Sequence, residues 1–223
     1  MEVIDISAIR IAYIFSICTA FIIGLIVYKY NKRLNILVGL IGLGVFTELF
    51  VEVNKYIKID TENFFYNIYI PLEYFLYAFF FYKINEHRLL RKLILISIPL
   101  FIGIAIVATV FKETFSYYLA TDIYTISGLL VIIWSIWTLF VLKPIKNIKF
   151  TMHPLFWICI GIIIFHSGII PFNMTRDYIK EYNYELFDWL SKFYQKGFNI
   201  WLYTAFSIGF ICSHRMKIYK KLY

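Results

Sequence analysis

The sequence predicts an all-α fold: a polytopic membrane bundle of seven transmembrane helices, with the N-terminus outside and the C-terminus in the cytoplasm. Three observations lead to this prediction. Apolar residues make up 61% of the chain and charged residues only 16%, against roughly 45–50% and 25% in ordinary soluble domains. Seven apolar runs approach or reach the length of about 20 residues that a span needs. Clusters of Lys and Arg follow every second run. A single transmembrane domain over residues 1–223 is expected.

The apolar runs are interpreted as helices because they are longer and more continuous than strands, and because the alternating pattern of a membrane β-barrel is missing. The last run is the shortest, but Glu185–Lys196 before it has apolar residues at helical spacing. We expect this stretch to extend the last helix or to lie along the membrane interface. In chain order the runs are Ile9–Tyr28, Leu34–Val53, Phe64–Tyr82, Leu93–Phe111, Leu119–Leu142, Pro154–Phe172 and Gly197–Cys212.

The first run is expected to be a signal anchor and not a cleaved signal peptide. The residues before it include Glu2 and Asp5 and no early basic cluster, and the run continues to a basic stop at Lys29. The three cysteines lie inside or at the ends of apolar runs, so we expect them to pack as small hydrophobic residues and not to form a disulfide framework.

Orientation is predicted from the basic residues, because short loops rich in Lys and Arg stay in the cytoplasm. Fourteen of the 22 basic residues lie on one side of the seven-span arrangement, with Glu86 as the single acid, and the other eight share the opposite side with nine acids. The net charge of +8 is thereby explained by topology. The fourteen are Lys29, Lys32, Arg33, Lys83, Arg88, Arg91, Lys92, Lys143, Lys146, Lys149, Arg215, Lys217, Lys220 and Lys221.

Four acidic residues fall within the predicted spans: Glu48, Glu52, Glu73 and Asp122. Ionisable groups at this depth are costly and tend to face the bundle interior, a partner or a water-filled cavity. The predicted topology collects the polar groups in the outer half of the bundle, beside Pro71, which can kink its helix. The candidate ligand-binding residues are Glu48, Glu73, His166, Asn67, Asp122, Asn199 and Tyr203.

Simpler structural interpretations compete with these assignments. Glu52 and Asp122 are expected at the headgroup level, where ordinary solvation accounts for them. His166 is either a charge partner of one of the deep carboxylates or a hydrogen-bonded packing residue. The tyrosines near the outer boundary are interpreted as an aromatic belt; they are Tyr66, Tyr69, Tyr117 and Tyr118.

Known intramembrane chemistries find little support in the sequence. Only His166 of the four histidines lies in the outer cluster, so a zinc site with several imidazoles is not expected, although a site for a harder cation stays open. An aspartyl protease needs two aspartates within spans, and only Asp122 is present. No pair of glycines has the GxxxG spacing. We expect no cofactor and assign no catalytic residue.

Two segments carry a resemblance to known proteins: Pro154-Leu-Phe-Trp-Ile-Cys-Ile-Gly161, continuing to Pro171, and Asn199-Ile-Trp-Leu-Tyr203. They resemble runs in uncharacterised bacterial seven-span proteins, some of which occur as sensor modules. The whole chain resembles, in its architecture, the membrane part of bacterial seven-span sensory receptors. That resemblance implies a protein of the cytoplasmic membrane, but the sequence lacks the attached cytoplasmic effector of a signalling receptor.

Three functions follow as hypotheses. The first is a non-enzymatic membrane protein that binds a small molecule, lipid or cation in an outward-facing acidic pocket, as a sensor-like component or transporter. The second is an intramembrane enzyme that modifies a lipid, with one carboxylate as acid or base. The third is a scaffold or effector whose polar residues only join helices. Membrane lipids and a separate cytoplasmic protein are the expected partners, and nucleic acid is not.

Overall fold

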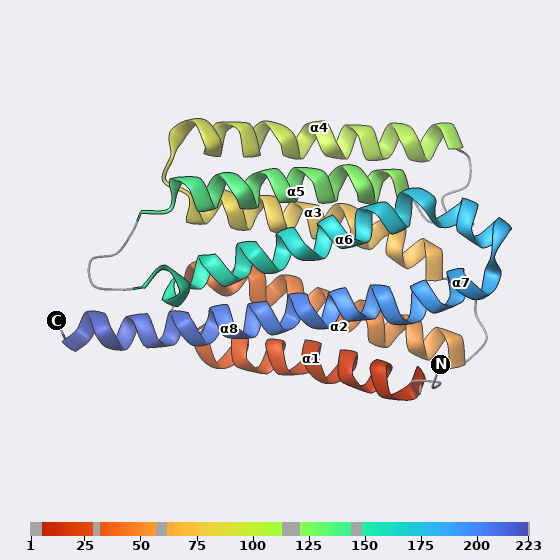
Figure 1. Cartoon of the computed structure of the whole chain (residues 1–223). Coiled ribbons are helices and arrows are strands. Elements are labelled where there is room, and N and C mark those ends of the chain that lie inside the picture. Colours follow the sequence, from red (N-terminus) through yellow and green to blue (C-terminus); the bar gives the residue numbers. More distant parts are fainter. Residues whose placement is uncertain (1–5, 29–31, 57–61, 113–120, 144–148, 223) are drawn as a thin grey trace. The chain divides into compact units, whose positions relative to one another are not determined.

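The computed structural model describes residues 6–28, 32–56, 62–112, 121–143 and 149–222, and within these ranges the chain is helical and contains no strand (Figure 1). The all-α class is therefore confirmed. The long helices are α1 (Ile6–Val27), α2 (Asn35–Tyr56), α3 (Glu62–Ile84), α4 (Arg88–Lys112), α5 (Thr121–Val141), α6 (Pro154–Tyr182) and α8 (Gln195–Leu222). The short elements are η1 (Lys32–Leu34), η2 (Phe150–Met152), α7 (Tyr184–Trp189) and the π-helical turn η3 (Leu190–Tyr194).

Five helices in the described part of the chain are long and apolar enough to cross a membrane. They lie in α1, in η1–α2, and in α4, α5 and α6, and they identify the chain as a membrane protein by length and composition. Helices α3 and α8 are also long enough, with 23 and 28 residues. They carry more polar and charged side chains, among them Glu73 in α3 and the basic residues at the end of α8.

The helices pack into two compact units. Unit 1 comprises residues 1–32 and 139–223 and contains α1, α6, α7, η3 and α8. Unit 2 comprises residues 33–138 and contains α2, α3, α4 and most of α5.

Close contact between α6 and α8 holds unit 1 together. Glycine allows this approach: a Cβ atom at Gly161 would lie 2.7 Å from the Cβ of Ala205, and one at Gly209 would lie 2.8 Å from Ile158 Cγ1. Residues later in α6 contact residues earlier in α8, so the two helices are antiparallel. The pairs that face each other are Ile158 with Gly209, Gly161 with Ala205, and Gly168 with Phe198.

Helix α1 packs along α8. The ring of Tyr13 lies 6.2 Å from the ring of Tyr203, measured between centroids. Figure 1 shows α1 and α8 running in the same direction, with α6 running in the opposite one. The beginning of α1 therefore lies at the α7 end of unit 1, and the end of α8 lies at the opposite end.

The segment between α6 and α8 is helical. Asn183 breaks the helix with extended backbone angles and caps α7 by accepting a hydrogen bond from the Leu186 amide at 3.0 Å. Helix α7 then continues through η3 into α8, because Trp189, Leu190 and Gln195 keep right-handed helical angles. The prediction that Glu185–Lys196 extends the last helix is confirmed.

Helix α3 lies between α2 and α4 in unit 2 and packs against both. It is antiparallel to α4: the Tyr74 ring packs at a tilt against Phe101, with centroids 4.2 Å apart, and further along α3 the Tyr82 ring lies 4.4 Å from the guanidinium of Arg91. A buried hydrogen bond of 2.9 Å from the amide of Asn85 to the hydroxyl of Thr138 joins the end of α3 to α5.

Candidate functional site: an acidic cluster on α2 and α3

Two adjacent helices of unit 2 carry carboxylates that are not exposed, one half-buried on α2 and one buried on α3. We call Glu48 of α2 together with Tyr66, Asn67, Tyr69 and Glu73 of α3 the acidic cluster. Its members occupy the apolar stretch of the helix pair. Polar side chains contribute little to apolar packing. Inside a bilayer each of them must find hydrogen-bond partners within the protein.

Glu48 joins α2 to α3. The Tyr66 hydroxyl donates a hydrogen bond to Glu48 Oε1 at 3.2 Å, and both side chains are half-buried. Directly beside them the rings of Phe50 and Phe65 lie 4.3 Å apart. The two contacts fix the antiparallel register of the helices. The carboxyl group of Glu48 thus links α2 to α3 through the phenol of Tyr66.

Glu73 lies deeper along α3 and is only 8% exposed. Its Oε1 accepts a hydrogen bond of 3.2 Å from the hydroxyl of Tyr69, one turn earlier on the same helix. Residues 66, 69 and 73 recur at helical spacing, so the phenols and the second carboxylate share one face of α3. The separation of Tyr66 and Glu73 along the helix axis is about 10 Å.

Asn67 places a neutral polar group at the same level. It is 4% exposed, and the register set by Glu48 and Tyr66 brings it level with the buried Thr47 of α2. Helix α3 continues through Pro71. Pro71 has no amide hydrogen, so α3 passes through this residue without the backbone hydrogen bond that an ordinary residue would donate there.

These groups offer two carboxylates, two phenol hydroxyls and a carboxamide in an apolar setting. Carboxylates accept hydrogen bonds and attract cations, while the aromatic rings of Tyr66 and Tyr69 can stabilise a cation through their faces. Such a combination suits a positively charged group that also donates hydrogen bonds. It does not by itself supply a nucleophile or an oxyanion site.

Two tyrosines of the predicted aromatic belt contact the carboxylates. The hydroxyls of Tyr66 and Tyr69 donate to Glu48 and Glu73, and their place in a belt stays a prediction. A single sequence contains one signal for this: Tyr69 precedes Glu73 by four residues and so must lie beside it on a helix. Tyr117 and Tyr118 of the predicted belt lie outside the described residues.

The other two acids within the predicted spans are Asp122 and Glu52. Asp122 is exposed in the first turn of α5, where a carboxylate is favoured by the positive end of the helix dipole. The side chain of Glu52 lies outside the described part of the chain. Neither residue is placed in the acidic cluster.

The three remaining candidate residues lie in unit 1. His166 of α6 is buried, and its ring meets Phe165 edge-on at 4.9 Å between centroids. The Asn199 amide donates to the Gln195 carbonyl of its own helix at 3.0 Å. Tyr203 is buried against α1 through Tyr13. A pocket that combines these residues with the acidic cluster stays a prediction.

No group of three or more His, Cys, Asp or Glu side chains that could hold a metal ion occurs within the ranges that the structure describes. Comparison with known proteins found no matching family model, curated protein or solved structure.

Proposed function

We propose that the protein is a seven-span protein of the cytoplasmic membrane that binds a small organic cation, such as a protonated amine, at the acidic cluster, as a sensor-like component or transporter. The observation that carries the proposal is the pair of carboxylates, Glu48 and Glu73, each within hydrogen-bond distance of a tyrosine hydroxyl inside an apolar helix pair.

Two carboxylates within an apolar helix pair carry an energetic cost. A carboxylate at span depth is unfavourable unless a cation or hydrogen bonds compensate for it. A phenol donates to Oε1 of each carboxylate, and a carboxylate also binds cations. A protonated amine would supply the positive charge and further donors to the same oxygens, and the adjacent rings would favour it through cation–π attraction.

A scaffold function is the second candidate, and the bond between Tyr66 and Glu48 favours it, because this bond crosses from α3 to α2. In a scaffold the carboxylates serve only to join helices. The two functions differ in what Glu73 does. Tyr69, which donates to Glu73, lies on the same helix, so this bond joins no helices. A scaffold therefore has no use for the Glu73 carboxylate, whereas an amine-binding protein has.

Binding of the fluorescent primary amine dansylcadaverine to the purified protein tests the proposal. Glu73→Gln keeps the shape of the side chain and removes its charge, so we expect roughly 10- to 100-fold weaker binding, as for the loss of a hydrogen bond to a charged group. The matched control is Glu86→Gln, which removes the same charge from an exposed residue of unit 2 and should leave the affinity unchanged.

Fluorescence titration of the three proteins measures these affinities, and helical circular dichroism checks that each is folded. Equal affinities for the wild type and a folded Glu73→Gln variant would remove this carboxylate from the site. No measurable binding of dansylcadaverine to the wild type, with loss of folding in Tyr66→Phe, would favour the scaffold, because the bond from Tyr66 to Glu48 joins α3 to α2.

Helix directions support seven spans over five. If only the five most apolar helices crossed the membrane, α6 would be the fifth span and would run parallel to α1. In unit 1, however, α6 runs opposite to α1 and α8 (Figure 1). Counting α3 as a span makes α6 the sixth and restores the observed direction. Helix α8 packs antiparallel along α6 from Phe198 to Gly209, which supports its crossing at the same depth.

Labelling from the two sides of the membrane tests this topology. In a variant without native cysteines, a cysteine at Thr175, near the end of α6, should react with an impermeant reagent added outside the cell. A reporter fused after Tyr223 should be active only in the cytoplasm. A five-span protein with the N-terminus outside would place Thr175 in the cytoplasm, so labelling only from the inside would overturn the seven-span arrangement.

A further inference from the structure

A row of stacked aromatic rings runs along α3 towards its C-terminal end. The rings of Phe75 and Phe79 are nearly parallel, with centroids 6.0 Å apart and an interplanar angle of 4°. Those of Phe79 and Tyr82 follow at 6.5 Å and 14°. We call these three residues the aromatic strip. Over its length the strip rises about 10 Å along the helix.

Two cations cover the end of this strip. Lys83 Nζ lies 5.2 Å from the centre of the Phe79 ring, and the guanidinium of Arg91 lies 4.4 Å from the centre of the Tyr82 ring. The rings thereby hold both cations at one end of α3, close to the start of α4. We call Lys83 and Arg91 the cation pair. Stacking on a ring face leaves the N–H edges of a guanidinium available for a planar acceptor.

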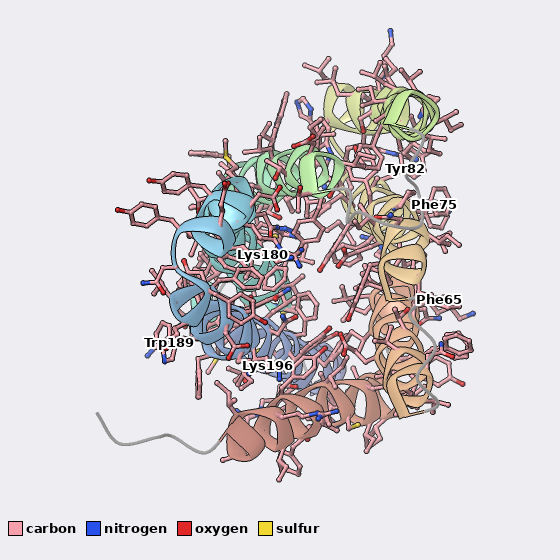
Figure 2. The ribbon with its side chains drawn as sticks, turned by 90° about the vertical axis from the view of Figure 1, so that its right-hand side faces the viewer. Phe65, Phe75, Tyr82, Lys180, Trp189 and Lys196 are labelled. Atoms are coloured by element: carbon pink, nitrogen blue, oxygen red, sulfur yellow. The ribbon has the colours of Figure 1, made fainter. Side chains whose placement is uncertain are left out.

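The strip lies on the surface of unit 2. Phe75 is 40% exposed and Lys83 is exposed, while the side chains of Phe79 and Tyr82 are half-buried. Figure 2 shows Phe75 and Tyr82 on the part of α3 nearer to α4, and Phe65 on the part nearer to α2. The exposed Leu72 continues this surface from Phe75 towards the middle of the helix. In a membrane protein such a surface meets acyl chains.

The acid nearest in sequence does not cancel the cation pair. Glu86 is 4.0 Å from Arg33, a basic residue at the start of unit 2. Further basic residues, Arg88 and Lys92, are exposed on the first turns of α4. The end of the aromatic strip is therefore positively charged, and it lies at the boundary of the candidate span Arg88–Ala108.

We propose that the aromatic strip and the cation pair form a binding site for one anionic phospholipid. Its headgroup phosphate lies between Lys83 and Arg91, and an acyl chain follows the rings from Tyr82 to Phe75. The positive charge of Lys83 and Arg91 favours an anionic headgroup. The strip starts at the membrane boundary and runs into the apolar layer, and this position favours a lipid over a soluble anion. The site is independent of the amine-binding function proposed above, because it uses neither Glu48 nor Glu73.

Titration of the detergent-solubilised full chain with fluorescent phosphatidylglycerol, and with phosphatidylcholine carrying the same label, tests the site. The variant Lys83→Gln/Arg91→Gln should bind phosphatidylglycerol about 30-fold more weakly, since each basic residue near an anionic lipid contributes about a fivefold factor. The control Lys143→Gln/Lys149→Gln removes the same charge from exposed residues of unit 1 and should bind like the wild type.

Equal losses in the two variants would overturn the proposal, because general surface charge would then explain the affinity. Equal affinity of the wild type for the two lipids would overturn it as well. Arg91→Lys keeps the charge but loses the planar contact with Tyr82, so we expect a two- to fivefold loss of phosphatidylglycerol binding. This variant tests the site even if the double variant does not fold, and unchanged binding would argue against a headgroup held by Arg91.

Discussion

Replacing Gly161 by Leu is expected to destabilise unit 1 more than any other single change considered for this unit. A Cβ atom at Gly161 would already lie 2.7 Å from the Cβ of Ala205. Both atoms are fixed by their backbones, so no rotation of a side chain relieves the overlap, and the helices must separate. Overpacking of this kind costs roughly 1–3 kcal/mol, occasionally more. Leucine adds three further carbon atoms to the same space.

A matched control separates this clash from the general effect of replacing a glycine. A Cβ atom added at Gly103 of α4 would have no neighbouring atom within 4 Å. Gly103→Leu should therefore leave stability unchanged or raise it slightly, because leucine favours the helix. Double replacement by Gly161→Ala and Ala205→Gly should recover most of the stability that Gly161→Ala alone loses, because it moves the methyl group from one helix to the other.

Cys159 provides the measurement for these variants. Its side chain is fully buried, two residues before Gly161, and all three cysteines of the chain lie in unit 1. In a background in which the half-buried Cys18 and Cys212 are replaced by serine, labelling of Cys159 by a thiol-reactive dye during heating should begin at a lower temperature with Gly161→Leu than without it or with Gly103→Leu. Identical labelling curves for the two leucine variants would show that the contact between α6 and α8 does not limit the stability of unit 1.

Hydropathy predicted where the long helices lie, but not where they end. Helix α6 was predicted to stop at Phe172 and continues to Tyr182. The extra residues include Arg176, Asp177 and Lys180, which are too polar for a span but compatible with a helix. Hydropathy detects the cost of transfer into lipid, whereas helix formation depends on backbone hydrogen bonds that continue beyond the apolar layer.

Contacts between helices were the part of the site that the sequence could not supply. Glu48 and Glu73 stood out because charges are rare in spans. The partner of Glu48, however, is Tyr66 on the next helix, and the register of two helices depends on side-chain packing that no spacing rule within one helix encodes. The same limit applied to Gly161 and Ala205, small residues that meet across α6 and α8 without a GxxxG spacing on either helix.

Tyr74→Ala is the second large expected effect, and it concerns unit 2. Tyr74 is 1% exposed, and its ring packs on Phe101 of α4 with centroids 4.2 Å apart. Its hydroxyl donates to the Ser97 hydroxyl at 2.7 Å, and Ser97 in turn donates to the Ile94 carbonyl at 2.7 Å. Removing the ring leaves a cavity between α3 and α4, which costs roughly 3–5 kcal/mol for a large aromatic side chain.

Tyr74→Phe separates the two contributions. It keeps the ring against Phe101 and removes one hydrogen bond, while the Ser97 hydroxyl keeps its bond to the Ile94 carbonyl. A loss of about 1 kcal/mol is expected. Circular dichroism during thermal unfolding in detergent should therefore rank the wild type first, Tyr74→Phe slightly lower and Tyr74→Ala far lower. If phenylalanine lowered the unfolding temperature as much as alanine does, the hydrogen bond would outweigh the packing of the ring.

Ligand binding should follow the fold in the same variants, because Glu73 is the neighbour of Tyr74 on α3. The phenylalanine variant keeps its fold and should still bind dansylcadaverine. The alanine variant should lose binding together with its fold.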